Sequence, residues 1–113
     1  MVIQVLQIIA VLGTIATGLI SVVRPLSVRA FTGLEATGAR GITEIRAVLG
    51  GAFIGLGIAP LLFNARAAYQ TLGITYLVIA ITRAVSIVID RSTEKSNFIS
   101  LIVEVIFGVL LML

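Results

Sequence analysis

The sequence predicts an all-α fold: an integral membrane four-helix bundle with a short interfacial segment between its first and second helices. Three observations support this prediction: 59% of the residues are hydrophobic, only 12% are charged, and the mean hydropathy is +1.22. A soluble domain of this composition would expose too much apolar surface to water. Since a helical span needs about 20 residues, the 113 residues leave room for four crossings in a single domain.

Four apolar stretches fit these crossings, and we expect helices over residues of about 2–23, 42–63, 65–90 and 98–113. The first stretch is longer than a signal-peptide core and has no basic start before it, so it is expected to be retained. Pro25 ends it, because proline cannot donate to the helical hydrogen-bond ladder. Residues 25–41 alternate apolar side chains with Arg29 and Glu35, which is typical of a segment in the headgroup layer; a lid over a pocket is the alternative.

Basic residues predict the orientation of these helices. The first and third connections hold Arg24, Arg29, Arg40, Arg91 and Lys95, whereas the second connection holds only Arg66. By the positive-inside rule, both termini are expected to face away from the cytoplasm. The formal net charge of +3 is too small to indicate nucleic acid as a partner, so these side chains are expected to meet lipid headgroups.

Small residues recur every four positions along the second span, at Ala47, Gly51, Gly55 and Ala59. On an α-helix they share one face, and this helix-packing seam lets another helix backbone approach closely. Glu44 shares that face in the first turn, where a carboxylate also complements the helix dipole. If the helix dipole does not stabilise it, a charge at the end of a close-packed seam needs a partner inside the bundle.

Two further charges lie inside the third and fourth spans at matched depth. Arg83 and Glu104 are each roughly 10 Å from the same membrane face, at about 1.5 Å of rise per residue. A short loop makes their helices antiparallel neighbours, and either charge alone in lipid would cost on the order of 3 kcal/mol, so we expect an ion pair. Glu44 is a second candidate carboxylate for the guanidinium. Arg46 either reaches the headgroups or turns towards Glu104.

Asp90 shares a helix face with Arg83, and Asn97 and Ser100 approach the face of Glu104. These three residues are candidates for the mouth of a polar wedge that opens to the cytoplasm. Two interpretations of the intramembrane polar cluster of Glu44, Arg46, Arg83 and Glu104 remain open. In the first interpretation, the cluster fixes the register of the helices. In the second, the cluster lines a pocket for an amphipathic ligand or carries protons.

The sequence gives little support to an enzyme. It contains no His and no Cys, which removes the usual zinc sites, iron–sulfur clusters and c-type haem attachment. The run G-G-A-F-I-G-L-G from Gly50 lies inside an apolar span, so its likeness to a nucleotide-binding loop is spurious. No catalytic residue, metal or cofactor is therefore expected.

Several residues together resemble a known family. They are Pro25, F-T-G-L at residues 31–34, E-I-R-A-V-L-G-G at residues 44–51, Arg83 followed by Asp90, and Glu104 with Gly108. In these positions the chain is similar to small bacterial four-helix membrane proteins, the domain-of-unknown-function 4345 family, allied to the DoxX-like group. The resemblance implies a bundle in the bacterial inner membrane with Glu44, Arg46, Arg83 and Glu104 as its characteristic polar set. It implies no established activity.

Three hypotheses for function follow. The leading one is a non-catalytic, multi-pass membrane module that packs with itself or as an accessory subunit with other membrane subunits, surrounded by membrane lipids. The second is a protein that binds or transports a lipophilic molecule, such as a quinone, lipid or carotenoid, in the wedge around Arg83 and Glu104. The third, a redox-associated membrane enzyme, rests on the DoxX-like analogy alone.

Overall fold

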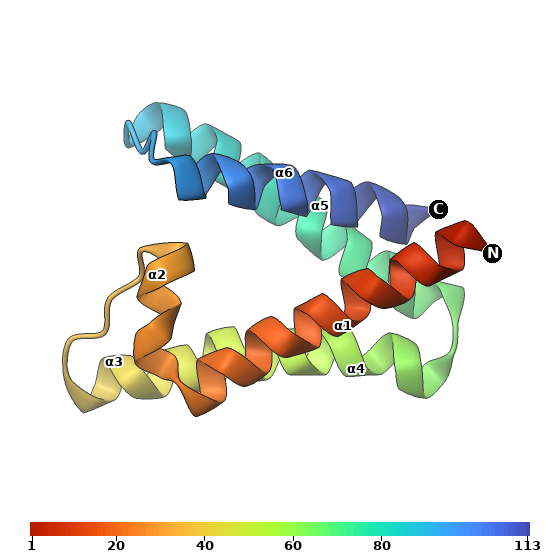
Figure 1. The fold of residues 1–113 in the computed structure, drawn as a ribbon, viewed down its shortest axis with the longest axis horizontal. Helices are drawn as coiled ribbons and strands as arrows, with labels where there is room; N and C mark the ends of the chain where they lie inside the picture. Colours follow the sequence, from red (N-terminus) through yellow and green to blue (C-terminus); the bar gives the residue numbers. More distant parts are fainter. The chain divides into compact units, whose positions relative to one another are not determined.

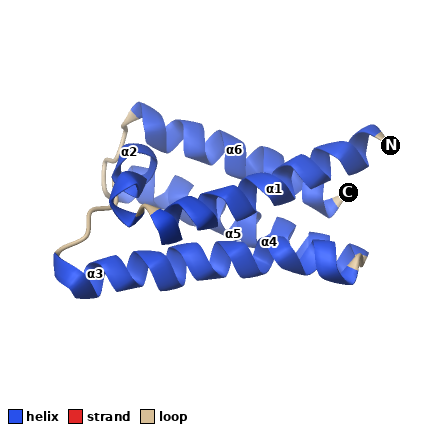
Figure 2. Cartoon of the chain, turned by 60° about the horizontal axis from the view of Figure 1, so that its bottom comes forward, coloured by secondary structure: helices blue, strands red, loops and turns tan.

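The computed structural model describes residues 1–113 and contains helices and no strand (Figure 2). The prediction of an all-α fold is confirmed. Four helical stretches are long and apolar enough to cross a membrane: Val2–Val23, Gly38–Phe63, Arg66–Ile89 and Lys95–Met112. The chain therefore fits a multi-pass membrane protein.

The helical elements follow one another with short connections. They are α1 (Val2–Val23), the 3-10 helix η1 (Pro25–Val28), α2 (Arg29–Thr32), α3 (Gly38–Glu44), the π-helix η2 (Ile45–Gly51), α4 (Ala52–Phe63), α5 (Arg66–Ile89) and α6 (Lys95–Met112). The elements α3, η2 and α4 run on without a break and form the second span. This span begins four residues before the start of the expected helix, at Gly38 rather than at residue 42.

The chain forms two compact units, residues 1–8 with 65–113 and residues 9–64. In the first unit α5 and α6 run antiparallel, joined by a short turn (Figure 1, teal and blue). In the second unit α1 runs antiparallel to the span that ends in α4 (Figure 1, orange and green). The first unit thus contains the α5–α6 pair with the start of α1, and the second contains the rest of α1 with the span that ends in α4.

Glycines bring the two helix backbones of the second unit close together. A Cβ added to Gly18 would lie 2.7 Å from the Gly50 carbonyl oxygen and 2.9 Å from the Ile54 backbone nitrogen. Further along, a Cβ added to Gly57 would lie 2.6 Å from Ile15 Cγ1. Only residues without a side chain fit at these crossings.

The glycines of the expected helix-packing seam occupy a different face. A Cβ added to Gly51 or Gly55 would meet nothing within 4 Å, whereas their neighbours Gly50 and Gly57 contact α1. Gly50 and Gly57 are seven positions apart and share one helix face, next to the face that holds Gly51 and Gly55. The i→i+5 hydrogen bonds of the π-helix put more residues into each turn, which rotates Glu44 relative to the residues of α4.

The first unit also has a close crossing. A Cβ added to Gly73 on α5 would lie 3.0 Å from the Gly108 carbonyl oxygen on α6. Beside this crossing, the rings of Tyr76 and Phe107 meet edge to face, with centroids 5.5 Å apart and planes at 87°. Edge-to-face contact suits the aromatic quadrupole and adds to the packing of α5 on α6.

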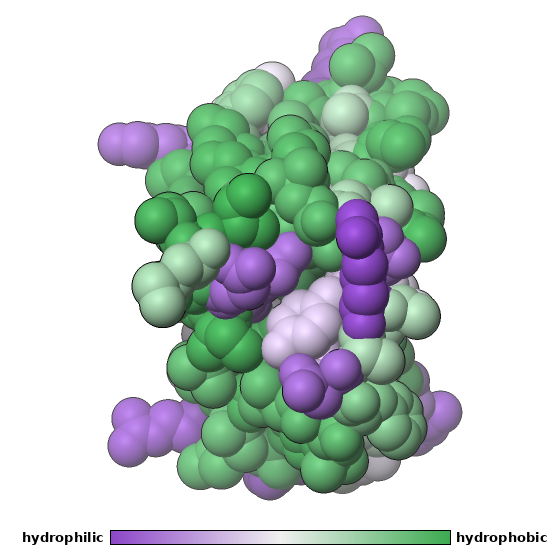
Figure 3. Space-filling model, turned by 90° about the vertical axis from the view of Figure 1, so that its right-hand side faces the viewer, coloured by the Kyte–Doolittle hydropathy of each residue, from purple (hydrophilic) through white to green (hydrophobic).

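Large apolar side chains cover the outside of the helices. Among the most exposed are Val88, Leu62 and Phe63, each more than two-thirds accessible, and the face drawn in Figure 3 is mostly hydrophobic. Such a surface would be a liability in water but is what lipid tails require.

Candidate functional site

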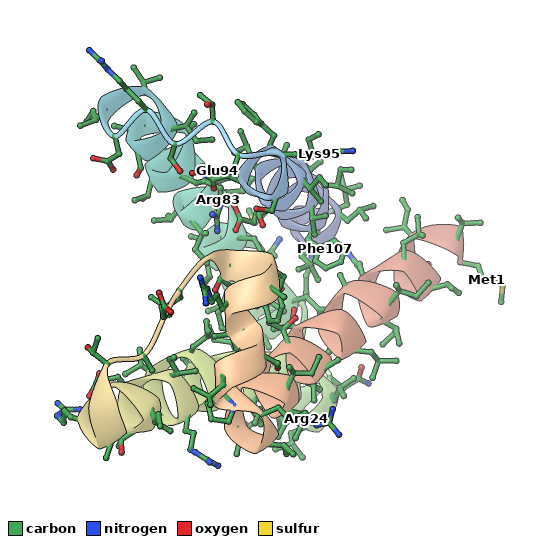
Figure 4. All side chains as sticks on the ribbon, turned by 60° about the vertical axis from the view of Figure 1, so that its left-hand side comes forward. Met1, Arg24, Arg83, Glu94, Lys95 and Phe107 are labelled. Atoms are coloured by element: carbon green, nitrogen blue, oxygen red, sulfur yellow. The ribbon has the colours of Figure 1, made fainter.

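The candidate site is built around an ion pair between the two helices of the first unit. Arg83 on α5 donates from Nε to Glu104 Oε1 at 2.7 Å and from Nη2 to Glu104 Oε2 at 2.7 Å. Glu104 is buried, and Figure 4 shows Arg83 beside α6. The planar guanidinium and the carboxylate therefore meet in the two-pronged geometry that gives the strongest charge-assisted hydrogen bonds.

A chain of hydrogen bonds leads from this pair to the loop between α5 and α6. Arg83 Nη1 donates to Asn97 Oδ1 at 2.8 Å, and Asn97 Nδ2 donates to Ser92 Oγ at 2.9 Å and to the Ser92 carbonyl oxygen at 3.1 Å. Ser92 Oγ in turn donates to Glu94 Oε2 at 2.7 Å. We call these five residues the Arg83 network: Arg83, Glu104, Asn97, Ser92 and Glu94.

The outer end of the network affects the ionisation of one carboxyl group. Glu94 precedes the membrane-length part of α6 and is fully exposed. The hydrogen bond from the Ser92 hydroxyl stabilises its charged form and lowers the pKa of Glu94 below its ordinary value. Towards the membrane interior, no buried side-chain nitrogen or oxygen lacks a hydrogen-bond partner, so the polar groups inside the helices are satisfied within the protein.

Glu44 and Arg46, the other two members of the expected polar cluster, belong to the second unit. There Glu44 forms an ion pair with Arg40, one helical turn earlier on α3. Arg46 Nη1 donates to the Val22 carbonyl oxygen near the end of α1 at 2.6 Å. The partner of Glu44 was visible in the sequence as an arginine four positions away, a spacing that puts both side chains on the same side of a helix.

The three residues expected at the mouth of a wedge have different surroundings. Asn97 is bonded directly to Arg83. Asp90 is exposed and accepts a hydrogen bond from Ser86 Oγ at 2.6 Å. Ser100 is half-buried on α6. Asn97 is therefore the one of the three that the structure bonds to the ion pair.

Some polar contacts of the first unit escaped the sequence analysis. Ser92 bridges Asn97 and Glu94, and Gln7 Nε2 donates to the Leu110 carbonyl oxygen at 2.9 Å. A serine in a polar loop and a glutamine on an apolar helix are common in membrane proteins, so neither pattern distinguishes a bridging residue from a solvated one. The structure contains no group of three or more His, Cys, Asp or Glu residues that could hold a metal ion.

Comparison with known proteins identifies a family. A family model described as a domain of unknown function (DUF4345) matches residues 2–113. No curated protein and no solved structure matches the chain. Because this description assigns no activity, the function has to be argued from the side chains described above.

Proposed function

Because the chain belongs to the family described as a domain of unknown function (DUF4345), we propose that it is a non-catalytic membrane module that acts through helix packing. It associates with itself or serves as an accessory subunit of a larger membrane complex. The single observation that carries this proposal is the bidentate bond between Arg83 and Glu104.

The geometry of this bond favours a structural role. Both oxygens of Glu104 already accept from Arg83, and a third guanidinium nitrogen is bonded to Asn97. A ligand or proton relay at Glu104 would need an open carboxylate oxygen, whereas both oxygens of this carboxylate are occupied by Arg83. Since a lone charge in lipid costs several kcal/mol, sliding α5 against α6 would expose both charges and is opposed by that cost. The ion pair thus fixes the register of the two helices.

The proposal includes a location. The resemblance to small bacterial proteins of the DoxX-like group supports the bacterial inner membrane, and the distribution of arginines supports termini that face away from the cytoplasm. The connection after α1 carries Arg24, Arg29 and Arg40, while the turn after α4 carries Arg66 alone. A reporter fused to the C-terminus is expected to lie outside the cytoplasm and to be active there. Activity of the fused reporter in the cytoplasm would contradict the proposed orientation.

Native mass spectrometry tests the function itself. The protein is extracted gently from its own membrane, and the mass of the assembly and of any released small molecule is measured. If the protein acts through helix packing, we expect the measurement to find a homo-oligomer or a complex with other membrane subunits, without a stoichiometric lipophile. A monomer that carries one lipophilic molecule per chain would contradict it.

A second candidate function, binding of a lipophilic molecule such as a quinone, lipid or carotenoid, is favoured by one observation. Three of the five N–H groups of Arg83 are used in the hydrogen bonds described above, and its side chain is 29% exposed. The remaining two can donate to a carbonyl or phosphate oxygen. This alternative predicts a bound molecule that Arg83→Ala releases and that the control Arg66→Ala, which alters a contact to the Leu113 backbone, retains.

A further inference from the structure

The segment that follows α1 carries more positive charge than it neutralises. Residues 24–46 hold four arginines and two glutamates. One pair is Arg29 with Glu35, joined at 3.2 Å, and the second glutamate is bonded to Arg40. Arg24 and Arg46 have no acidic partner, so the uncompensated charge of this segment resides on these two side chains.

Both uncompensated arginines are placed at the same helix end. Arg46 Nη1 donates to the carbonyl oxygen of Val22, the penultimate residue of α1. Arg24 directly follows the last residue of α1, and its backbone N–H still donates to the Ile20 carbonyl oxygen at 2.7 Å. The negative end of the helix dipole favours cations here. Figure 4 shows Arg24 at this end of α1.

The guanidinium groups have donors to spare. Arg46 uses one of its N–H groups on Val22, and the side chain of Arg24 makes no hydrogen bond or ion pair. Both residues are exposed. An arginine offers five donors in a planar fork that matches the oxygens of a phosphate, so most of the donors of this pair remain available to a ligand.

Apolar side chains flank the arginines. The segment runs from the start of η1 through α2 to Leu34. Its side chains Leu26, Phe31 and Leu34 are 68%, 38% and 49% exposed, whereas Pro25 and Val28 are buried. The segment is thus fixed to its unit by one side and presents apolar groups on another. Apolar residues beside exposed cations are the pattern of a segment at the boundary between lipid headgroups and acyl chains.

We propose that Arg24 and Arg46 form a binding site for the phosphate of an anionic phospholipid, with the apolar side chains of the flanking segment against its acyl chains. This inference goes beyond helix packing, because it assigns a lipid class to one membrane face of the second unit. Charge complementarity selects the ligand: the paired Arg29 and Arg40 contribute little net charge, while the two uncompensated arginines attract a headgroup that is itself negative.

The test compares lipid retention by matched variants. Wild-type protein is purified with equimolar phosphatidylglycerol and phosphatidylcholine, and native mass spectrometry counts each retained lipid. The wild type is expected to prefer phosphatidylglycerol, and Arg24→Gln with Arg46→Gln is expected to reduce this preference about tenfold or more. The control, Arg91→Gln with Lys95→Gln, removes the same charge from a loop where Asp90 and Glu94 already balance it, and is expected to keep the preference.

A single substitution guards against misfolding. Arg24→Gln breaks none of the side-chain contacts described here, so the helices are expected to stay intact by circular dichroism while the preference for phosphatidylglycerol falls roughly fivefold. Equal retention of the two lipids by the wild type would overturn the proposal. So would an equal loss of preference in the arginine variants and in the loop control, because net charge rather than this site would then explain the binding.

Discussion

Both units have a close glycine crossing, but only the first adds an ion pair inside the span. The first unit joins α5 to α6 through an ion pair inside the span, Arg83 with Glu104. The second unit joins α1 to its partner span through backbone approach at Gly18, Gly50 and Gly57, and its charges lie near the ends of the helices. Lipid gives apolar side chains no reason to prefer one another, so a helix pair needs close packing or polar bonds. The comparison shows both solutions in one short chain.

The largest effect is expected from breaking the ion pair. Arg83→Met leaves the buried carboxylate of Glu104 without its partner, which is expected to cost about 3 kcal/mol of unfolding free energy. Unfolding by a denaturing detergent, followed by circular dichroism, measures this loss. The control Arg66→Met alters only a contact to the Leu113 backbone and is expected to cost about 1 kcal/mol or less. Equal losses would mean that the ion pair stabilises the first unit no more than an exposed contact to backbone does.

A smaller effect is expected from filling a backbone crossing in the second unit. The Cβ of Gly18→Ala would press on backbone atoms of Gly50 and Ile54, which cannot give way as a side chain can, so a cost of about 1–3 kcal/mol is expected. The matched control Gly55→Ala has open space around its new Cβ and is expected to be neutral or stabilising by up to about 1 kcal/mol. Equal stability of the two variants in the same unfolding assay would contradict the assigned crossing.

The crossing in the first unit is expected to tolerate the same change better. The nearest atoms to a Cβ on Gly108 are Leu77 Cδ2 at 2.6 Å and Cγ at 2.7 Å, the far end of a flexible side chain, with the Gly73 carbonyl oxygen at 3.3 Å. Rotation of Leu77 relieves most of the clash, so Gly108→Ala is expected to cost about 1 kcal/mol. If it destabilises more than Gly18→Ala, the first unit depends on backbone approach as strongly as the second.

The smallest effect concerns the loop end of the Arg83 network. Ser92→Ala removes the hydroxyl that lowers the pKa of Glu94, so this pKa is expected to rise towards its ordinary value, as NMR titration of the carboxyl group can show. Because the folded pKa is lowered, the hydrogen bond stabilises the fold above the ordinary glutamate pKa. That contribution is lost as the pH falls through the folded pKa. Ser100→Ala should leave the titration unchanged, and an unchanged pKa in Ser92→Ala would rule out the hydroxyl as the cause.

Local patterns in the sequence were sufficient for much of the fold. Apolar runs of sufficient length and the position of Pro25 predict where the spans begin and end to within a few residues, because lipid excludes an unpaired backbone. The bond between Arg83 and Glu104 was foreseeable for a related reason. Two charges at equal depth on helices joined by a short loop have few other partners, and the structure joins them.

Other features depend on geometry that the sequence does not encode locally. The second span carries small residues on more than one face, and the structure brings Gly50 and Gly57, not Gly51 and Gly55, against α1. The π-helix from Ile45 to Gly51 is a further departure from α-helical spacing that the sequence pattern does not reveal. Glu44 was expected to complement the helix dipole or to be a second carboxylate for Arg83, which is distant in sequence. The structure gives it a nearby partner, Arg40, because the helix already begins at Gly38 and so includes it.

The most direct test of the central claim is the stability and assembly of the double variant Arg83→Met with Glu104→Met. If the ion pair only fixes helix register, two apolar side chains of suitable volume can replace it. The double variant is then expected to unfold within about 1 kcal/mol of the wild type, to be more stable than Arg83→Met alone, and to keep the wild-type assembly in native mass spectrometry. A double variant that folds as stably as the wild type but loses a bound lipophile or its assembly would contradict the claim and make the pair a binding site.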